Sequence, residues 1–130
     1  MKIVRELKTK MKINCVEKAY KYLKEFIDED REHFIVLGLD TNKRPLYREI
    51  AHIGTIDKAI VSPAAIFRKA IVMNCNSIII AHNHPSGDTE ASEADLKINK
   101  ALKEIGELID IKVVDNIIIG NSYNSIIEAS

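Results

Sequence analysis

Two histidines and a carboxylate lie close together in this sequence and could hold a metal ion. His82 and His84 are two positions apart at the end of a short apolar segment, and Asp95 follows after a polar loop. Side chains of a β-strand alternate between its two faces, so residues at i and i+2 point the same way and can bind one ion. Two imidazoles and one carboxylate leave a fourth position for water, which is typical of a catalytic rather than a structural zinc site.

The segments on either side of these residues are those expected to position them. Residues 77–81 are branched and uniformly apolar, which predicts a strand covered on both faces. Pro85 and Gly87 then turn the chain, and the pattern of residues 93–107 predicts a helix. Because Asp95 falls in the first turn of that helix, the loop can bring its carboxylate back over the two imidazoles.

Ser92 and Asp95 also have an interpretation that needs no metal. Ser-x-x-Asp at the start of a helix is close to a capping box, in which each side chain bonds to the other residue's backbone amide. That role is sufficient by itself to explain both residues. The two interpretations are compatible, because the cap would determine where the aspartate stands.

Helical and extended segments alternate along the rest of the chain and predict an α/β protein. Asn14 is the expected cap of a first helix, whose apolar residues recur at helical spacing as far as Ile27. Ser62-Pro63 predicts another helix start, because serine accepts from first-turn amides and proline fits the first helical position. The predicted extended segments are residues 33–40, 46–56, 59–61, 77–81, 111–119 and 123–127. This order indicates a mixed β-sheet flanked by helices.

Length and composition indicate one ordinary globular domain. The chain has 130 residues, 46% of them hydrophobic and 29% charged, which is enough for a real core. The formal net charge of zero argues against a strong nucleic-acid footprint. Residues 1–12 are locally basic and are interpreted as an N-terminal arm or an extra strand, before a domain of residues 13–130. Without an evident signal peptide, membrane span or disulfide framework, we expect a soluble cytoplasmic protein with no membrane partner.

The candidate site residues resemble the signature of a known enzyme superfamily. His82-x-His84, seven residues, Ser92, two residues and Asp95 is similar, without gaps, to the motif of the JAMM (MPN-type) metalloprotease domains. The fuller string His-Asn-His-Pro-Ser-Gly-Asp, which begins at His82, resembles the RadC branch of that superfamily. Further similarities are Arg31-Glu-His-Phe34, Gly54-Thr55, Ser62-Pro63 and Ile117-Ile-Ile-Gly120. The resemblance covers roughly residues 13–127 and implies an α/β/α arrangement with cytidine-deaminase-like layering.

The resemblance also implies roles for individual residues. Carried over by position, His82, His84 and Asp95 would be the ligands of one Zn²⁺ per chain. The hydroxyl of Ser92 would help to stabilise a tetrahedral intermediate.

JAMM enzymes also use an upstream glutamate as the general base. Glu32 is the preferred candidate because it lies just before the first long strand, and Glu49 in the second extended segment is the alternative. One position departs from the family pattern, which often has histidine after an aspartate near the last long strand. This chain has Asp115-Asn116 there.

Taken together, the resemblance implies a zinc-dependent metallopeptidase that cleaves a peptide or isopeptide bond in a peptide or protein substrate. Two other functions stay open: a DNA-repair-associated nucleic-acid protein or nuclease, and a non-catalytic metal-binding interaction module. Neutral charge and only seven aromatic residues disfavour the recognition of nucleic-acid strands. A zinc nucleobase deaminase is rejected, because the chain has neither a His-x-Glu nor a Pro-Cys-x-x-Cys element.

Overall fold

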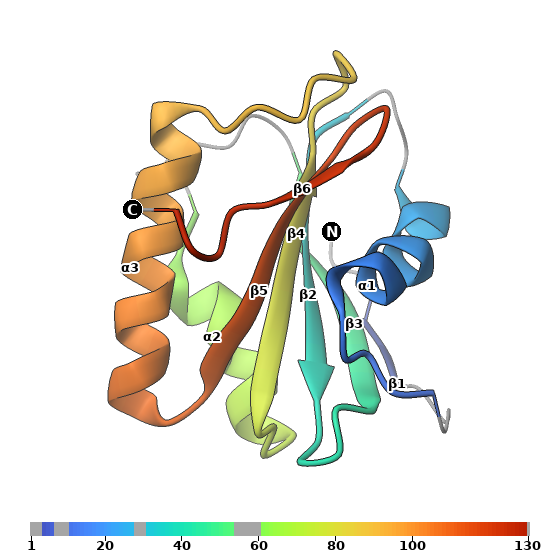
Figure 1. Ribbon diagram of the computed structural model, residues 1–130. Helices are drawn as coiled ribbons and strands as arrows, with labels where there is room; N and C mark the ends of the chain where they lie inside the picture. The colour runs from blue at the N-terminus through green and yellow to red at the C-terminus, as the bar shows by residue number, and fades with distance from the viewer. Residues whose placement is uncertain (1–3, 7–10, 28–30, 54–60, 130) are drawn as a thin grey trace.

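The computed structural model describes residues 4–6, 11–27, 31–53 and 61–129, which form a β-sheet with helices on both faces (Figure 1). The strands are β1 (Val4–Glu6), β2 (His33–Leu39), β3 (Pro45–Ile53), β4 (Ser77–Asn83), β5 (Lys112–Ile119) and β6 (Tyr123–Ser125). The helices are α1 (Val16–Leu23), the short 3₁₀ helix η1 (Lys24–Phe26), α2 (Pro63–Val72) and α3 (Glu93–Ile109). This architecture confirms the predicted α/β class.

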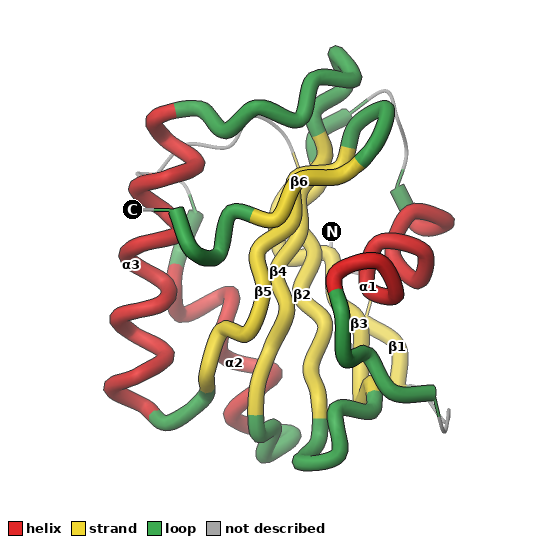
Figure 2. The backbone as a smooth tube through the Cα atoms, viewed as in Figure 1, coloured by secondary structure: helices red, strands yellow, loops and turns green. Residues whose placement is uncertain are grey.

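The sheet is mixed, as predicted. Its strand order is β1-β3-β2-β4-β5-β6, and Figure 2 shows the strands as one continuous central layer. The neighbours β4 and β5 are parallel and are connected through α3, whereas the other neighbouring pairs are antiparallel. The central position of β4 places its carboxyl end between β2 on one side and β5 on the other.

Two separate cores hold the layers together. Every residue of β2 and of β4 is buried, because helices cover both faces of the sheet. On one face α2 and α3 pack against the strands, through residues that include Ile66, Phe67, Ile98, Leu102, Phe34 and Ile80. On the other face α1 packs through Ala19 and Leu23 against residues that include Ile35, Leu37 and Ile79. The layering is therefore helix, sheet, helix.

The first helix begins one residue later than expected. Its N-cap is Cys15, which makes no side-chain cap hydrogen bond, so the prediction that Asn14 caps this helix is wrong. The reason lies in the residue before it: Ile13 is buried and donates its backbone amide to Lys43 O at 2.8 Å. This anchor keeps the chain extended through Cys15, where φ is −154° and ψ is 160°.

Other predicted elements differ mainly at their ends. The helix start at Ser62-Pro63 is confirmed, with the serine side chain accepting from Ala65 N at 3.4 Å. The extended segment predicted to reach residue 56 ends at Ile53 in β3, and residues 54–60 lie outside the described part of the chain. The short strand predicted at residues 59–61 falls largely there too, as does Gly54-Thr55. Within the described ranges, no helix is long and apolar enough to cross a membrane.

Candidate metal centre

Strand β4 and its neighbours determine where the two histidines lie. His82 pairs with Phe34 of β2 and shares its face of the sheet, with the two rings parallel at a centroid distance of 6.0 Å. His84 follows immediately after β4, where its backbone amide donates to Ile119 O at the end of β5, at 2.9 Å. Gly87, with φ at +88°, closes the next turn by donating its amide to His84 O at 2.9 Å. Hydrogen bonds on both sides of His84 therefore hold its backbone.

The N-terminus of α3 positions the carboxylate. Ser92 is the N-cap, and its side chain accepts from Asp95 N at 3.1 Å. In return, Asp95 Oδ2 accepts from Ser92 N at 2.8 Å. This is the capping box that the sequence predicted, and it aims a carboxylate that is only 3% exposed at the carboxyl end of β4.

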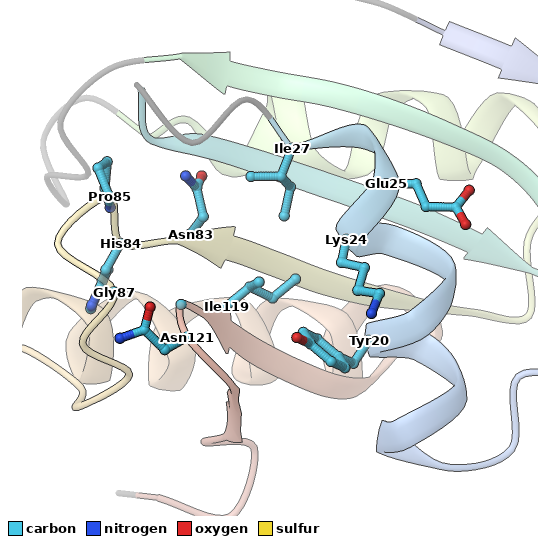
Figure 3. Close-up of a pocket in the computed structure, with 11 residues that line it drawn as sticks. Tyr20, Lys24, Glu25, Ile27, Asn83, His84, Pro85, Gly87, Ile119 and Asn121 are labelled. Carbon is cyan, nitrogen blue, oxygen red and sulfur yellow. The ribbon is translucent and has the colours of Figure 1, made fainter.

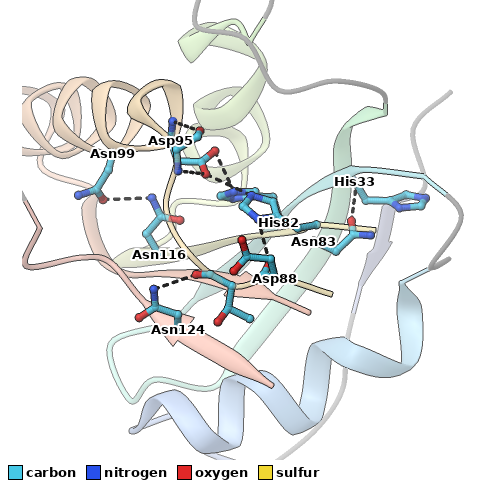
Figure 4. A network of polar contacts seen from close by, with 11 residues as sticks. His33, His82, Asn83, Asp88, Asp95, Asn99, Asn116 and Asn124 are labelled. Atoms are coloured by element: carbon cyan, nitrogen blue, oxygen red, sulfur yellow. Dashed lines mark hydrogen bonds and ion pairs between the residues drawn. The ribbon is translucent and has the colours of Figure 1, made fainter. Parts of the chain in front are cut away.

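The three predicted ligands converge on one point, and Figure 4 shows His82 and Asp95 turned toward one another. His82 Nε2 lies 3.1 Å from Asp95 Oδ1, and His84 Nε2 lies 3.1 Å from Asp95 Oδ2. The candidate ligand atoms all lie within 4.8 Å of one another. For tetrahedral zinc with bonds of about 2.0–2.1 Å, ligand atoms should stand about 3.3 Å apart. The spacing therefore fits a metal ion.

Hydrogen bonding of the rings also fits a metal. His84 Nδ1 lies 3.0 Å from Asp88 O, a carbonyl that can only accept, so Nδ1 carries the hydrogen. In neutral His84 this leaves a lone pair on Nε2, facing a carboxylate. In His82, Nε2 faces Asp95 Oδ1 at 3.1 Å, and Nδ1 has no hydrogen-bond partner among the described residues although the side chain is only 2% exposed. Acceptors that face each other in a buried site call for a cation between them.

The electrostatics of Asp95 add to this argument. Burial opposes ionisation of its carboxyl, but the neighbouring His82, together with the amide and hydroxyl of Ser92, outweighs burial and holds the pKa well below its ordinary value. The site therefore carries a carboxylate anion at neutral pH. A buried His82-His84-Asp95 group with this charge can bind a metal ion.

The two candidate bases stand at different distances along the sheet from the metal ligands. In the antiparallel β2–β4 register the last pair is Phe34 with His82, and Glu32 comes two residues before Phe34, just ahead of β2. The side chain of Asn83 ties both neighbours of Glu32 to the end of β4: its Oδ1 accepts from His33 N at 2.7 Å, and its Nδ2 donates to Arg31 O at 2.7 Å.

Glu49 occupies a different position. It is buried in β3 opposite Val36, and β2 separates its strand from β4. Strands lie about 4.8 Å apart, so Glu49 starts roughly 10 Å to the side of the histidines. Glu49 is thus two strands away from β4, whereas Glu32 precedes the strand adjacent to it; the assignment of the base stays a prediction.

A hollow of about 490 Å³ lies between the α1–η1 segment and the loop that follows β4, and His84 is one of the residues that line it (Figure 3). One wall consists of Tyr20 and Lys24 from α1 and η1, and the other includes His84 and Asn121. Volumes of this size are common for ligand sites, which range over about 300–1,000 Å³. A molecule in this hollow would lie beside one of the metal ligands.

Comparison with known proteins decides the family. Residues 13–130 match the RadC-like JAB domain. This chain belongs to the RadC-like JAB domain family. It is 40% identical over 111 residues to a UPF0758 protein of Chlorobaculum parvum, and the match covers 85% of this chain and 50% of that protein.

Other curated relatives give the same picture. A UPF0758 protein of Desulforamulus reducens is 42% identical over 120 residues, covering 91% of this chain and 53% of that protein. A UPF0758 protein of Aliivibrio fischeri is 44% identical over 106 residues, covering 81% and 47%. This RadC-like JAB domain thus spans about half the length of the curated relatives it matches.

Some residues around the RadC-like metal centre were not singled out from the sequence. Phe34 stacks beside His82, and the backbone carbonyl of Asp88 orients His84. Asn99 lies one helical turn after Asp95, fully buried on α3. Its position offered a signal, because a polar residue on the inward face of an amphipathic helix requires a buried partner. A backbone carbonyl such as that of Asp88 leaves no trace in a sequence.

Proposed function

We propose that this RadC-like JAB domain is a zinc-dependent hydrolase that cleaves a peptide or isopeptide bond in a peptide or protein substrate. The supporting observation is the convergence of His82, His84 and Asp95 at the end of β4. Structural zinc sites normally have four protein ligands, whereas three His, Cys, Asp or Glu residues converge here within the described residues. A fourth position left for water or substrate is the mark of a catalytic site.

Zinc is the metal that we assign to this centre. Two imidazoles and one carboxylate that converge within 4.8 Å suit Zn²⁺, whereas Mg²⁺ and Ca²⁺ prefer oxygen ligands in larger number. When bound, zinc supplies a water of pKa about 7 and polarises the substrate carbonyl.

The residues around the centre have separate tasks in the proposed reaction. Glu32, which immediately precedes β2 on the strand next to β4, accepts a proton from the attacking water and delivers it to the leaving amine. The Ser92 oxygen accepts from Asp95 N, and its hydroxyl hydrogen turns from the Asp95 carboxylate to donate toward the oxyanion as that charge develops. One such donor contributes about 3 kcal/mol to transition-state stabilisation.

The hollow beside His84 offers a place for the chain of the substrate. Its walls carry aromatic, apolar and charged groups, including Tyr20, Ile27 and Lys24. Lys24 lies over the Tyr20 ring at 5.3 Å from the centroid, so the wall is already partly ordered. A mixed surface of this kind suits a peptide, which presents both backbone amides and side chains.

The proposal is tested in two stages. Elemental analysis of protein purified without added metal or a metal-binding tag should find about one zinc per chain. The loaded protein is then incubated with a panel of peptides and isopeptide-linked conjugates, with and without a chelator. If zinc is bound but no member of the panel is cleaved, the hydrolase proposal fails and a metal-binding interaction module takes its place.

Two matched substitutions identify the base. We expect Glu32→Gln to keep its zinc and lose activity by a factor of 10² to 10⁴, the usual contribution of a general base. Glu49→Gln, also isosteric, should keep most of the activity because β2 separates its strand from the ligands. The opposite pattern, with zinc retained in both variants, would assign the base to Glu49.

A further inference from the structure

Two buried asparagines lie beneath the metal centre and orient each other. Asn99 of α3 donates its side-chain nitrogen to Ile126 O at 2.9 Å and to Ala129 O at 3.0 Å. Its oxygen therefore faces the other way, where it accepts from Asn116 Nδ2 at 3.1 Å. Because carbonyls can only accept, neither amide can be flipped without breaking this chain of bonds.

One acceptor of this hydrogen-bonded asparagine pair has no partner among the described residues. Asn116 is 1% exposed, and its Oδ1 has no hydrogen-bond partner among the described residues. Figure 4 shows the amide between Asn99 and the ring of His82, with its nitrogen turned to Asn99. A buried polar atom without a partner is destabilising, so this oxygen requires a donor.

The ring of His82 offers a matching donor. If Nε2, which lies 3.1 Å from Asp95 Oδ1, binds the metal, Nδ1 of the neutral imidazole must carry the hydrogen. That nitrogen is also buried and without a hydrogen-bond partner in the described part of the chain. The site thus contains one donor and one acceptor that each lack a partner.

The strand register brings the donor and the acceptor together. On the parallel strands β4 and β5, His82 pairs with Ile118 and Ile80 pairs with Asn116. Both His82 and Asn116 reach side chains of α3, so they lie on the same face of the sheet. The two positions are therefore diagonal neighbours, and since neither atom has a hydrogen-bond partner in the described part of the chain, one water between them would satisfy both.

We propose that Asn116 is a positioning residue for His82: its Oδ1 accepts, directly or across one ordered water, the hydrogen on Nδ1 of the metal-bound ring. The inference rests on the metal-binding part of the proposed function. Such a contact fixes the tautomer of His82 and the direction of its Nε2 lone pair. Through the Asn116–Asn99 bond, the ring is then coupled to α3, the helix that also carries Asp95.

The test measures zinc affinity and the ring hydrogen itself. Zinc affinity of the parent, Asn116→Leu and Asn99→Leu proteins is measured by competition with a chromophoric chelator. Asn99→Leu is the comparison variant: it breaks the asparagine pair and releases the orientation of Asn116, but Asn116 Oδ1 itself is still present. We expect Asn116→Leu to weaken zinc binding 10- to 100-fold and Asn99→Leu to weaken it clearly less, because the acceptor is lost in the first variant and only its orientation in the second.

Proton–nitrogen correlation spectra of the histidine rings give a readout that needs no variant. In the zinc-loaded parent, His82 should bind through Nε2 and show an Nδ1–H as far downfield as that of His84, which donates to Asp88 O. Binding through Nδ1, or an Nδ1–H shifted well upfield of the His84 signal, would overturn the inference even if Asn116→Leu does not fold.

The outcomes separate this inference from the proposed function. Equal zinc affinity of Asn116→Leu and the parent, or equal weakening by Asn116→Leu and Asn99→Leu, overturns the positioning role and leaves the hydrolase proposal intact. Zinc binding that depends on Asn116 in a protein without hydrolytic activity supports the inference while the hydrolase proposal fails. A parent protein that binds no zinc overturns both.

Discussion

Replacing Ser92 by alanine separates its two assigned roles, helix cap and contributor to the metal centre. Four amides at the start of α3 have no partner within the helix, and the Ser92 side chain satisfies that of Asp95 at 3.1 Å. Alanine removes this bond but keeps the one from its own backbone amide to Asp95 Oδ2. Loss of one cap bond costs about 1 kcal/mol of the free energy of unfolding.

This loss of unfolding free energy can be converted into a decrease in melting temperature. Unfolding entropies of about 2.1 cal/mol/K per residue give roughly 0.27 kcal/mol/K for a chain of this length, so Ser92→Ala should melt about 4 °C lower. The metal-free protein is used for this measurement, by calorimetry or circular dichroism. Zinc affinity should fall about tenfold, because the first turn that aims Asp95 is held by one bond fewer.

The chain contains a matched control for the cap. Ser62 caps α2 in the same way, with its side chain accepting from Ala65 N at 3.4 Å, and takes no part in the metal centre. Ser62→Ala should lower the melting temperature by a similar or smaller amount and leave zinc affinity unchanged. If Ser92→Ala binds zinc as tightly as Ser62→Ala, the capping box does not aim the ligand and our reasoning is refuted.

Three further outcomes are expected. Gly87→Ala should lower the free energy of unfolding by about 1–2 kcal/mol, because φ at Gly87 is +88° and the new Cβ would stand 2.7 Å from the Asn121 side chain. Zinc binding should weaken as well, because this turn holds the backbone of His84. Melting and zinc affinity equal to those of the parent would contradict this prediction. Burial raises the pKa of the Cys75 thiol from 9.0 to about 11, so mass spectrometry after iodoacetamide treatment at pH 8 should find Cys15, which is exposed, modified long before Cys75. The same raised pKa means that the folded state favours the protonated Cys75 thiol. The contribution of this thiol to the free energy of unfolding is therefore fully present below pH 9 and is lost as the pH rises toward 11. A free energy of unfolding, measured with denaturant, that does not decline over this range would contradict the prediction.

Local pattern was sufficient to predict most of the fold. The uniformly apolar residues 77–81 predicted a strand covered on both faces, and β4 is buried at every position. Ser62-Pro63 and Ser92-x-x-Asp95 predicted two helix starts, and both caps are present. These predictions succeed because a cap or a buried strand depends on residues within one turn or one strand of each other. Asn14 failed as a cap because the distant carbonyl of Lys43 holds the chain just before it.

The sequence by itself determined the chemistry available at the site: two imidazoles on one side of a strand end, and a carboxylate anchored by its own helix cap. Only the tertiary structure decided how these groups meet, since α3 must fold back over β4 before Asp95 comes within 3.1 Å of His82 and His84. Strand order likewise became visible only in the folded chain: β2 separates the strand of Glu49 from β4, whereas Glu32 comes just before β2 itself. The pairing of Asn99 with Asn116, and the orientation it imposes on the acceptor near His82, depends on contacts between separate elements and could be seen only in the folded chain.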